Sequence, residues 1–190
     1  ASGMRILRLE EELMQARIQM EALAMHDGLT GLLNRRAIEE YAEAEFNMAG
    51  RKKQAMSVIL LDIDHFKNVN DRFGHKFGDV VLRQVAQTLK EDLRNYDRVG
   101  RWGGEEFLLI LPGTELKDAV TVAERLRSKT AAVQISLENG ETFSIHISLG
   151  AACATGKFQS LTKLIDAADQ ALYQAKQSGR DRICVFEAPQ

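Results

Sequence analysis

Ser57-Val-Ile-Leu-Leu-Asp-Ile63 is the stretch that decides the fold of this chain. It is a continuous apolar run with β-branched residues, which is typical of a strand buried on both faces at the centre of a sheet. Asp62 is its one charged residue and stands at the exit of the strand. A carboxylate there is costly unless it is solvated, paired or bound to a metal, so Asp62 is the first candidate site residue.

Downstream of this strand, the sequence predicts two β-hairpins. The first runs from Arg98 to Leu111 and turns at Gly103-Gly104. The second joins residues 133–137 to residues 142–152 through Asn139-Gly140, a dipeptide typical of a tight hairpin turn.

Apolar residues at helical spacing predict helices between these strands. The expected helices cover residues 34–48, 76–93, 115–129 and 161–178, a short helix begins near Lys67, and a closing strand covers residues 182–186. Helices that alternate with strands, two pairs of which are hairpins, predict an α+β fold with a mainly antiparallel sheet flanked by helices.

Residues 1–25 form a separate region. Ala1-Ser2-Gly3 is interpreted as a cloning remnant, and residues 4–25 contain no Gly or Pro and predict a helix. Its apolar residues follow a heptad pattern: Ile6, Leu9, Leu13, Ala16, Met20 and Leu23. The pattern favours a parallel coiled coil between two chains. The alternative is an amphipathic helix packed on its own domain, and it is less favoured because such an isolated helix would be only marginally stable alone. A start inside a heptad pattern also predicts an upstream domain in the parent protein, whereas residues 26–190 are expected to form one domain.

The composition narrows the function classes. The formal net charge of −2 lacks the basic excess of a general nucleic-acid binder. No apolar run approaches the ~20 residues of a membrane span, so no membrane contact is expected from this fragment, while an anchor elsewhere in the parent protein stays open. Cys153 and Cys184 have no metal-ligand spacing and are expected to be buried free thiols of a cytoplasmic protein.

Three carboxylates are expected to meet at one edge of the sheet. Asp62 ends the central strand, and Glu105 and Glu106 follow the Gly-Gly turn, so they converge if the first hairpin lies beside that strand. Hard oxygen ligands at such a point suit Mg²⁺, which binds through one or two carboxylates plus substrate phosphates. Ordinary solvated carboxylates at strand ends are the alternative.

Cations and glycines around this edge suit a phosphate ligand. Lys67 stands at the start of a short helix, whose N-terminal amides favour anions. Lys176 and Arg180 are four residues apart near the end of the last helix and share a face if the helix reaches Arg180. Gly103 and Gly104 allow close approach of the backbone to a ligand. A solvated helix face and an ordinary hairpin turn are the corresponding alternatives.

Asn70 and Asp79 are the candidates for base recognition. An amide and a carboxylate together can read the guanine edge, with the carboxylate accepting from the ring N–H and the exocyclic amine. Helix capping and turn formation are their alternative roles. His75 suits either a nucleotide contact or simple packing.

The order of the motifs resembles the GGDEF family of diguanylate cyclases. The motifs are Asp27-Gly-Leu-Thr-Gly-Leu-Leu-Asn-Arg-Arg36, Asp62-Ile-Asp-His-Phe-Lys-Asn-Val-Asn-Asp71 with Gly74-His-Lys-Phe-Gly-Asp79, the signature hairpin Arg101-Trp-Gly-Gly-Glu-Glu-Phe107 in its Gly-Gly-Glu-Glu-Phe form, and Ala168-Asp-Gln-Ala-Leu-Tyr-Gln-Ala-Lys-Gln-Ser-Gly-Arg180. The resemblance covers residues 25–187. It implies a polymerase-palm, nucleotidyl-cyclase-like (ferredoxin-like) fold and, for residues 26–190, the reaction 2 GTP → cyclic di-GMP + 2 pyrophosphate.

The resemblance also implies residue roles. Asp62, the Ile63 carbonyl and Glu105 would hold Mg²⁺ (or Mn²⁺), two ions per active homodimer, with Glu106 assisting. Glu105 would also accept the proton of the attacking 3′-hydroxyl. Asn70 and Asp79 would bind guanine, and Lys67, Lys176 and Arg180 the phosphates. The full set of implied nucleotide contacts is Phe66, Lys67, Asn70, His75, Asp79, Gly103, Gly104, Lys176 and Arg180.

Arg94-Asn-Tyr-Asp97 resembles the family's inhibitory Arg-x-x-Asp site, which binds the product cyclic di-GMP, and Arg125 lies where relatives supply a further arginine. Arginine forks suit the phosphates and guanine edges of that ligand. Three other readings remain: a catalytically silent GGDEF domain that regulates a partner, an inactive dimerisation module, and a cyclase making a mixed guanine–adenine product. The last is disfavoured because the resemblance associates it with Ser in place of Asp79.

Overall fold

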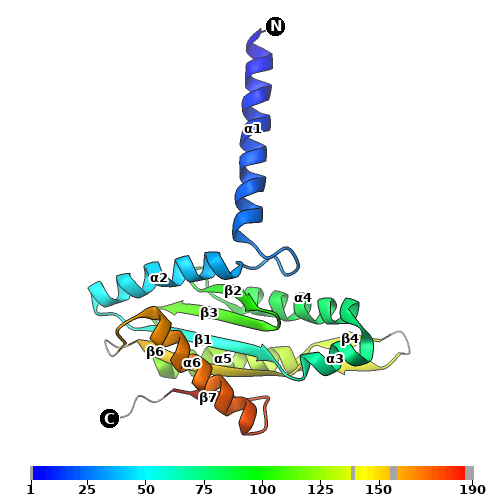
Figure 1. Ribbon diagram of the computed structural model, residues 1–190, viewed down its shortest axis with the longest axis vertical. Helices are drawn as coiled ribbons and strands as arrows, with labels where there is room; N and C mark the ends of the chain where they lie inside the picture. The colour runs from blue at the N-terminus through cyan, green and yellow to red at the C-terminus, as the bar shows by residue number, and fades with distance from the viewer. Residues whose placement is uncertain (1, 138–139, 155–157, 187–190) are drawn as a thin grey trace.

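A five-stranded sheet forms the centre of the molecule in the computed structural model, which describes residues 2–137, 140–154 and 158–186 (Figure 1). The strand order is β2-β3-β1-β6-β7. β1 (Met56–Ile63) is buried along its whole length, as its apolar run predicts, and pairs antiparallel with a strand on each side. The sheet is completed by β2 (Arg98–Gly103), β3 (Glu106–Pro112), β6 (Ile147–Ala154) and β7 (Ile183–Val185), of which β7 alone runs parallel to its neighbour within the described sheet.

Helices cover both faces of the sheet. Side chains alternate between the faces of a strand, so Ile59, Leu61 and Ile63 pack on one side of β1, and Val58 and Leu60 on the other. The first face is covered by α3 (Phe66–Phe73), α4 (His75–Asp92) and α5 (Leu116–Ala132), and the second by α2 (Arg35–Lys52) and α6 (Leu161–Gln177). The predicted helices are therefore confirmed, with ends that differ by a few residues.

The second predicted hairpin is wrong in one respect. The expected strand over residues 142–152 is two strands, because β5 (Thr142–Ser144) pairs with β4 (Gln134–Ser136) in a separate sheet, whereas β6 pairs with β1. The change of partner occurs at Ile145, which is buried, and His146, whose carbonyl accepts a hydrogen bond from the Asp64 amide at 2.9 Å. Asn139 of the predicted turn lies outside the described residues, and Gly140 has a φ of 84°.

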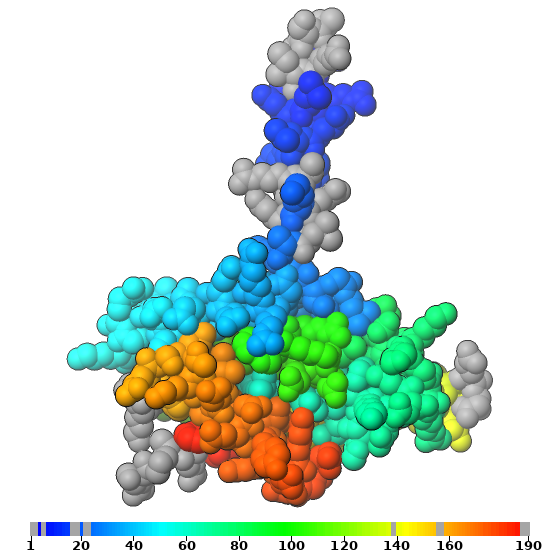
Figure 2. Space-filling model, in the orientation of Figure 1, coloured from blue at the N-terminus to red at the C-terminus, as the bar shows by residue number. Residues whose placement is uncertain are grey.

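α1 (Ser2–Met25) is a long helix that projects from the rest of the molecule (Figures 1 and 2). Of its predicted heptad stripe, the described side chains of Leu9, Leu13 and Met20 are 57%, 72% and 72% exposed. They do not pack on the domain, contrary to the alternative of an intramolecular amphipathic helix. Ala1 and the side chains of Ile6, Ala16 and Leu23 lie outside the description.

Two further expectations concern the thiols and the membrane. Cys153 and Cys184 are free but partly exposed, contrary to the prediction of burial; Cys184 lies on β7, which is an edge strand. Across residues 2–137, 140–154 and 158–186, no helix has the length and apolarity to span a membrane.

Candidate active site

The three predicted carboxylates lie together at the end of β1. The register of β1 and β3 places Asp62 directly opposite Glu106. The amide of Ile63 donates to the carbonyl of Glu105 at 3.4 Å, which holds the Gly-Gly turn against the end of β1. The predicted juxtaposition of hairpin and central strand is therefore present.

These carboxylates influence one another. Burial raises the pKa of Asp62 above its ordinary value, an effect that Lys176 partly offsets. Burial also raises the pKa of Glu105 and of Glu106, and the negative charge of Asp62 raises both further. A divalent cation bound among these partly buried carboxylates would reduce the repulsion between their negative charges.

The donor set fits a metal that is shared with substrate. No three His, Cys, Asp or Glu side chains in the described ranges are grouped closely enough to hold a metal by themselves. Mg²⁺ is usually bound by one or two protein carboxylates together with substrate phosphates and water, so a complete protein cage is not required. The site is therefore suited to a metal that arrives with a phosphorylated ligand.

Lys176 and Arg180 are held by different elements of the structure, the first by α6 and the second by the loop after it. Gly150 allows α6 to lie close to β6, since a Cβ there would sit 2.1 Å from the carbonyl oxygen of Ala168. Lys176 Nζ lies 2.8 Å from Asp62 Oδ2. Lys176 and Arg180 would share a helical face only if the helix reached Arg180, and this condition is not met because α6 ends at Gln177. Arg180 lies instead in the following loop, with a φ of 60° and its amide donating to the carbonyl of Ala175.

Asn70 and Asp79 lie on neighbouring helices. Asn70 is in α3, and its buried Oδ1 has no hydrogen-bond partner. Gly78 in α4 is required for this arrangement, because a Cβ there would lie 2.0 Å from that oxygen. Asp79, the next residue of α4 after Gly78, is half-buried. A buried, unpartnered amide oxygen points to a missing donor.

The other predicted nucleotide contacts differ in exposure. Lys67 and His75 are exposed. Phe66 is the first residue of α3. Its side chain is 8% exposed and packs in the core. Gly103 is half-buried and Gly104 is exposed at the β2–β3 turn.

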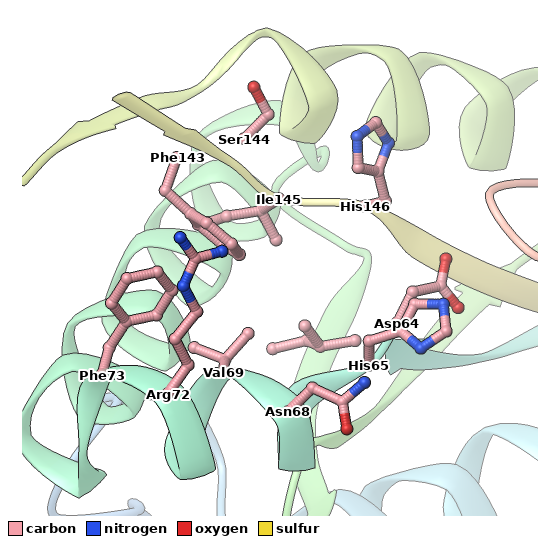
Figure 3. A pocket seen from close by; sticks show the side chains of 11 residues that line it. Asp64, His65, Asn68, Val69, Arg72, Phe73, Phe143, Ser144, Ile145 and His146 are labelled. Atoms are coloured by element: carbon pink, nitrogen blue, oxygen red, sulfur yellow. The ribbon is translucent and has the colours of Figure 1, made fainter. Parts of the chain in front are cut away.

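A pocket of about 240 Å³ lies between α3 and residues 143–146 (Figure 3). Asn68, Val69, Arg72 and Phe73 line it, whereas Lys67 and Asn70 project from the other face of the same helix at its 3.6-residue period. Its position separates it from the predicted nucleotide contacts. A second pocket of about 290 Å³, between α2 and α6, includes Glu106 in its wall.

Arg101 is a site residue that sequence reasoning did not single out. Its Nε and Nη2 donate to the carbonyl of Gly104 at 3.0 and 2.7 Å, and its Nη1 lies 3.2 Å from Asp27 Oδ2. Asp27 Oδ1 also accepts from the amide and the hydroxyl of Thr30. Arg101 thus fastens the Gly-Gly turn to the turn that follows α1. Its place in the signature motif was the available signal.

The residues predicted to bind product lie near one another beyond α4. Arg94 Nη1 donates to the hydroxyl of Tyr96 at 2.9 Å, and Arg125 Nε donates to Asp92 Oδ2. Burial raises the pKa of Asp97, while the charges of Arg94 and Arg125 oppose that shift. Asp97 Oδ1 is buried without a hydrogen-bond partner.

Removing one carboxyl charge is expected to stabilise the metal-free protein. A carboxyl whose pKa is raised by folding contributes stability below its unfolded pKa, and that stability is lost as the pH rises through the folded pKa. Glu106→Gln should therefore raise Tm by roughly 2 °C at neutral pH, the effect of somewhat less than 1 kcal/mol in a domain of this size. At about pH 4, where the unfolded carboxyl is largely protonated, the gain should vanish. Calorimetry in chelator measures both, with Glu115→Gln at an exposed position at the start of α5 as control. An unchanged or lower Tm at neutral pH contradicts the expectation.

Residues 24–182 match the family model described as the diguanylate cyclase, GGDEF domain, and the chain belongs to that family. The predicted nucleotidyl-cyclase-like α+β fold is confirmed by solved relatives. The coiled coil and GGDEF domain of DgcB from Caulobacter crescentus, solved in complex with c-di-GMP, aligns with a TM-score of 0.85 at 32% identity, covering 97% of this chain and 95% of that one.

Two curated bacterial proteins are similar in sequence. The uncharacterized protein YhcK of Bacillus subtilis (strain 168) is 42% identical over 170 residues, which are 89% of this chain and 47% of YhcK. The diguanylate cyclase DosC of Escherichia coli (strain K12) is 38% identical over 162 residues, 85% of this chain and 35% of DosC. The chain therefore spans less than half the length of either relative.

Proposed function

We propose that this domain condenses two molecules of GTP into cyclic di-GMP with release of two pyrophosphates. The observation that carries the proposal is the meeting of Asp62, Glu105 and Glu106 at the end of β1, next to the Gly-Gly turn and within reach of Lys176. Membership of the diguanylate cyclase family and the similarity to DosC support it.

In this reaction the 3′-hydroxyl of one GTP attacks the α-phosphorus of the other, and pyrophosphate leaves. Glu105 accepts the hydroxyl proton, a role that suits a carboxyl whose pKa burial and Asp62 hold above its ordinary value. Lys67, Lys176 and Arg180 bind the phosphates and offset their charge. Gly103 and Gly104 let the hairpin backbone approach the nucleotide.

Asp62, Glu105 and the Ile63 carbonyl would hold a divalent cation, with Glu106 beside them. When bound, the cation polarises the phosphoryl oxygens and neutralises charge that develops on the leaving pyrophosphate. The mutual repulsion of these carboxylates favours Mg²⁺ or Mn²⁺ arriving with the triphosphate, one per domain and two per active dimer.

Incubation with GTP and Mg²⁺, followed by chromatography, tests the proposal directly. Cyclic di-GMP and pyrophosphate in a ratio of one to two are expected. With equimolar GTP and ATP, cyclic di-GMP should dominate, because adenine lacks the paired donors that Asp79 accepts from. Binding of GTP without product would identify a silent domain, and a mixed product would remove Asp79 from base recognition.

Gly78→Ala is expected to weaken GTP binding by about tenfold or more. The new Cβ displaces the Asn70 amide, and the loss of one hydrogen bond in a buried site costs about 1–3 kcal/mol. Calorimetry with GTP in chelator measures the loss, and inorganic tripolyphosphate, which has no base, should bind the variant and the parent alike. Gly50→Ala is the matched control, because a Cβ there meets nothing within 4 Å. Unchanged GTP affinity in Gly78→Ala would exclude this placement of guanine.

We further propose that Arg94, Asp97 and Arg125 bind cyclic di-GMP and inhibit the enzyme. The unpartnered Oδ1 of Asp97 is an acceptor for a guanine donor, and the two arginines suit phosphates and guanine edges. The DgcB structure in complex with c-di-GMP supports binding of this ligand within the family.

Arg94→Ala should raise the cyclic di-GMP concentration that halves the rate by about tenfold, with little change in the initial rate. Losing one charge-assisted hydrogen bond of about 1.5–3 kcal/mol accounts for this shift. Initial rates over a range of added product measure it, and the exposed Arg83→Ala of α4 is the control. A parent enzyme that is indifferent to added product would show that no inhibitory site is present.

A further inference from the structure

The loop that follows α6 has an unusual backbone. Arg180 and Asp181 are consecutive residues with φ angles of 60° and 45°, and Gly179 before them has a φ of 110°. The left-handed region is unfavourable for residues with a Cβ, and such residues persist there only where neighbouring structure holds them. The structure must therefore contain contacts that hold this loop.

Asp64 supplies the first of these contacts. It lies one residue beyond β1 and is 8% exposed. Its Oδ2 accepts a hydrogen bond from the amide of Asp181 at 2.9 Å, and its Oδ1 accepts one from the hydroxyl of Ser148 at 2.7 Å. Both oxygens are thus engaged by the protein, so the carboxylate supports the loop rather than facing a ligand.

The side chain of Asp181 supplies the second set of contacts. Arg127 Nη1 of α5 donates to Asp181 Oδ1 at 2.8 Å, and His146 Nδ1 lies 3.1 Å from Asp181 Oδ2. Figure 3 shows Asp64 and His146 at the same end of the pocket, away from Phe73 and Phe143. The loop is therefore held by Asp64 just after β1, by Arg127 of α5 and by His146 of the segment before β6.

This arrangement connects Arg180 to the carboxylate cluster. Asp64 directly follows the buried strand β1, two residues after Asp62, and its carboxylate accepts a hydrogen bond from the amide that directly follows Arg180. Burial raises the pKa of Asp62, and the positive charge of Arg180, together with that of Lys176, offsets part of this effect. A shift of the Asp64–Asp181 contact would move Arg180 relative to the predicted metal ligand.

We infer that Asp64 and Asp181 are positioning residues that fix Arg180 relative to Asp62 and thereby set the affinity for the triphosphate of the nucleotide. The inference rests on the proposed function. It goes beyond it by assigning two carboxylates, neither of which touches substrate, to the recognition of the phosphate chain.

Binding of 3′-deoxy-GTP and 3′-deoxy-GMP in Mg²⁺ tests the inference. Neither nucleotide has the attacking hydroxyl, so binding is measured without turnover, and only the first carries the β- and γ-phosphates. Asp64→Ala and Asp181→Ala should each weaken 3′-deoxy-GTP by about tenfold through misplacement of one charge-assisted contact, and leave 3′-deoxy-GMP nearly unchanged. Asp64→Asn should restore most of the affinity, because its amide oxygen still accepts from Asp181 while its NH₂ donates to Ser148.

A double-mutant cycle separates positioning from general damage. If Asp64 acts through Arg180, then Asp64→Ala combined with Arg180→Ala should bind 3′-deoxy-GTP as Arg180→Ala alone does. Ser57→Ala is the matched control. It removes a buried side-chain hydrogen bond of β1, to the carbonyl of Thr114 at 2.7 Å, and should leave the ratio of the two affinities unchanged. Asp181→Ala keeps the test valid if Asp64→Ala does not fold, because Asp181 is partly exposed.

The outcomes are distinct. Equal weakening of both nucleotides, additive losses in the double variant, or unchanged binding in Asp181→Ala would each overturn the inference while leaving the proposed function standing. Failure of the parent protein to bind 3′-deoxy-GTP at all would overturn both.

Discussion

Glu105→Gln is expected to reduce cyclic di-GMP formation by about 10²–10³-fold or more. The variant keeps the size of the side chain but removes the proton acceptor and the negative charge of one carboxylate at the cation site. Loss of a single preorganised electrostatic contact already lowers the rate by about 10²–10³-fold. Steady-state rates at saturating GTP and Mg²⁺ measure the effect.

Glu115→Gln is the control, because Glu115 is exposed at the start of α5 and lies outside the carboxylate cluster. Circular dichroism and thermal unfolding should show that Glu105→Gln folds normally, since Glu105 is only half-buried. Turnover within a few-fold of the parent rate would remove Glu105 from the mechanism.

Leu9→Glu together with Leu13→Glu should reduce specific activity by roughly 10²-fold at low protein concentration, as expected when a linked second site is lost. In the proposed function each domain would provide one GTP site, and the product needs two phosphodiester bonds between two GTPs, so two domains would have to face each other. Both leucines are exposed on α1, and we propose that they pair with a second chain in a parallel coiled coil. The DgcB structure, described as a coiled coil and GGDEF domain, supports this arrangement.

Specific activity of the parent protein should rise with its concentration, since a helix of about three heptads pairs weakly. High concentration should partly restore the double variant. Gln15→Glu, at an exposed position outside the stripe, adds a negative charge to α1 and should have little effect. Specific activity that is independent of concentration, with the double variant unaffected, would show that α1 is not the dimerising element.

Most of the sheet was predictable because its signals are local. The apolar run of β1 and the Gly-Gly turn of β2 and β3 each lie within a few residues. The division of residues 142–152 into β5 and β6 was not predictable from the sequence. An extended sequence pattern does not indicate which strand is the pairing partner, and here the partner changes at His146. Register between distant strands depends on the packing of the whole sheet.

Some features of the candidate site were likewise predictable from local sequence signals, and others were not. The meeting of Asp62 with Glu105 and Glu106 followed from strand ends and one turn. The sequence left open whether the last helix reaches Arg180. In the structure α6 ends at Gln177, and Gly179 follows, a residue that commonly ends helices. The contact of Lys176 with Asp62 depends on how closely α6 lies on β6, which only the tertiary structure shows.

The contact of Arg101 with Asp27 and Gly104 bears on where this domain begins as a transferable unit. Residues 26–34 connect α1 to α2. In this segment the Asn34 amide donates to the carbonyl of Met25, and Arg101 joins Asp27 to the Gly-Gly turn. A chimera that attaches a foreign input domain at or before Met25 keeps both contacts. One that is joined after Asn34 leaves the guanidinium of Arg101 without its carboxylate and the Gly-Gly turn held from one side only. The practical boundary for exchanging modules therefore lies at the end of α1, not at the start of α2.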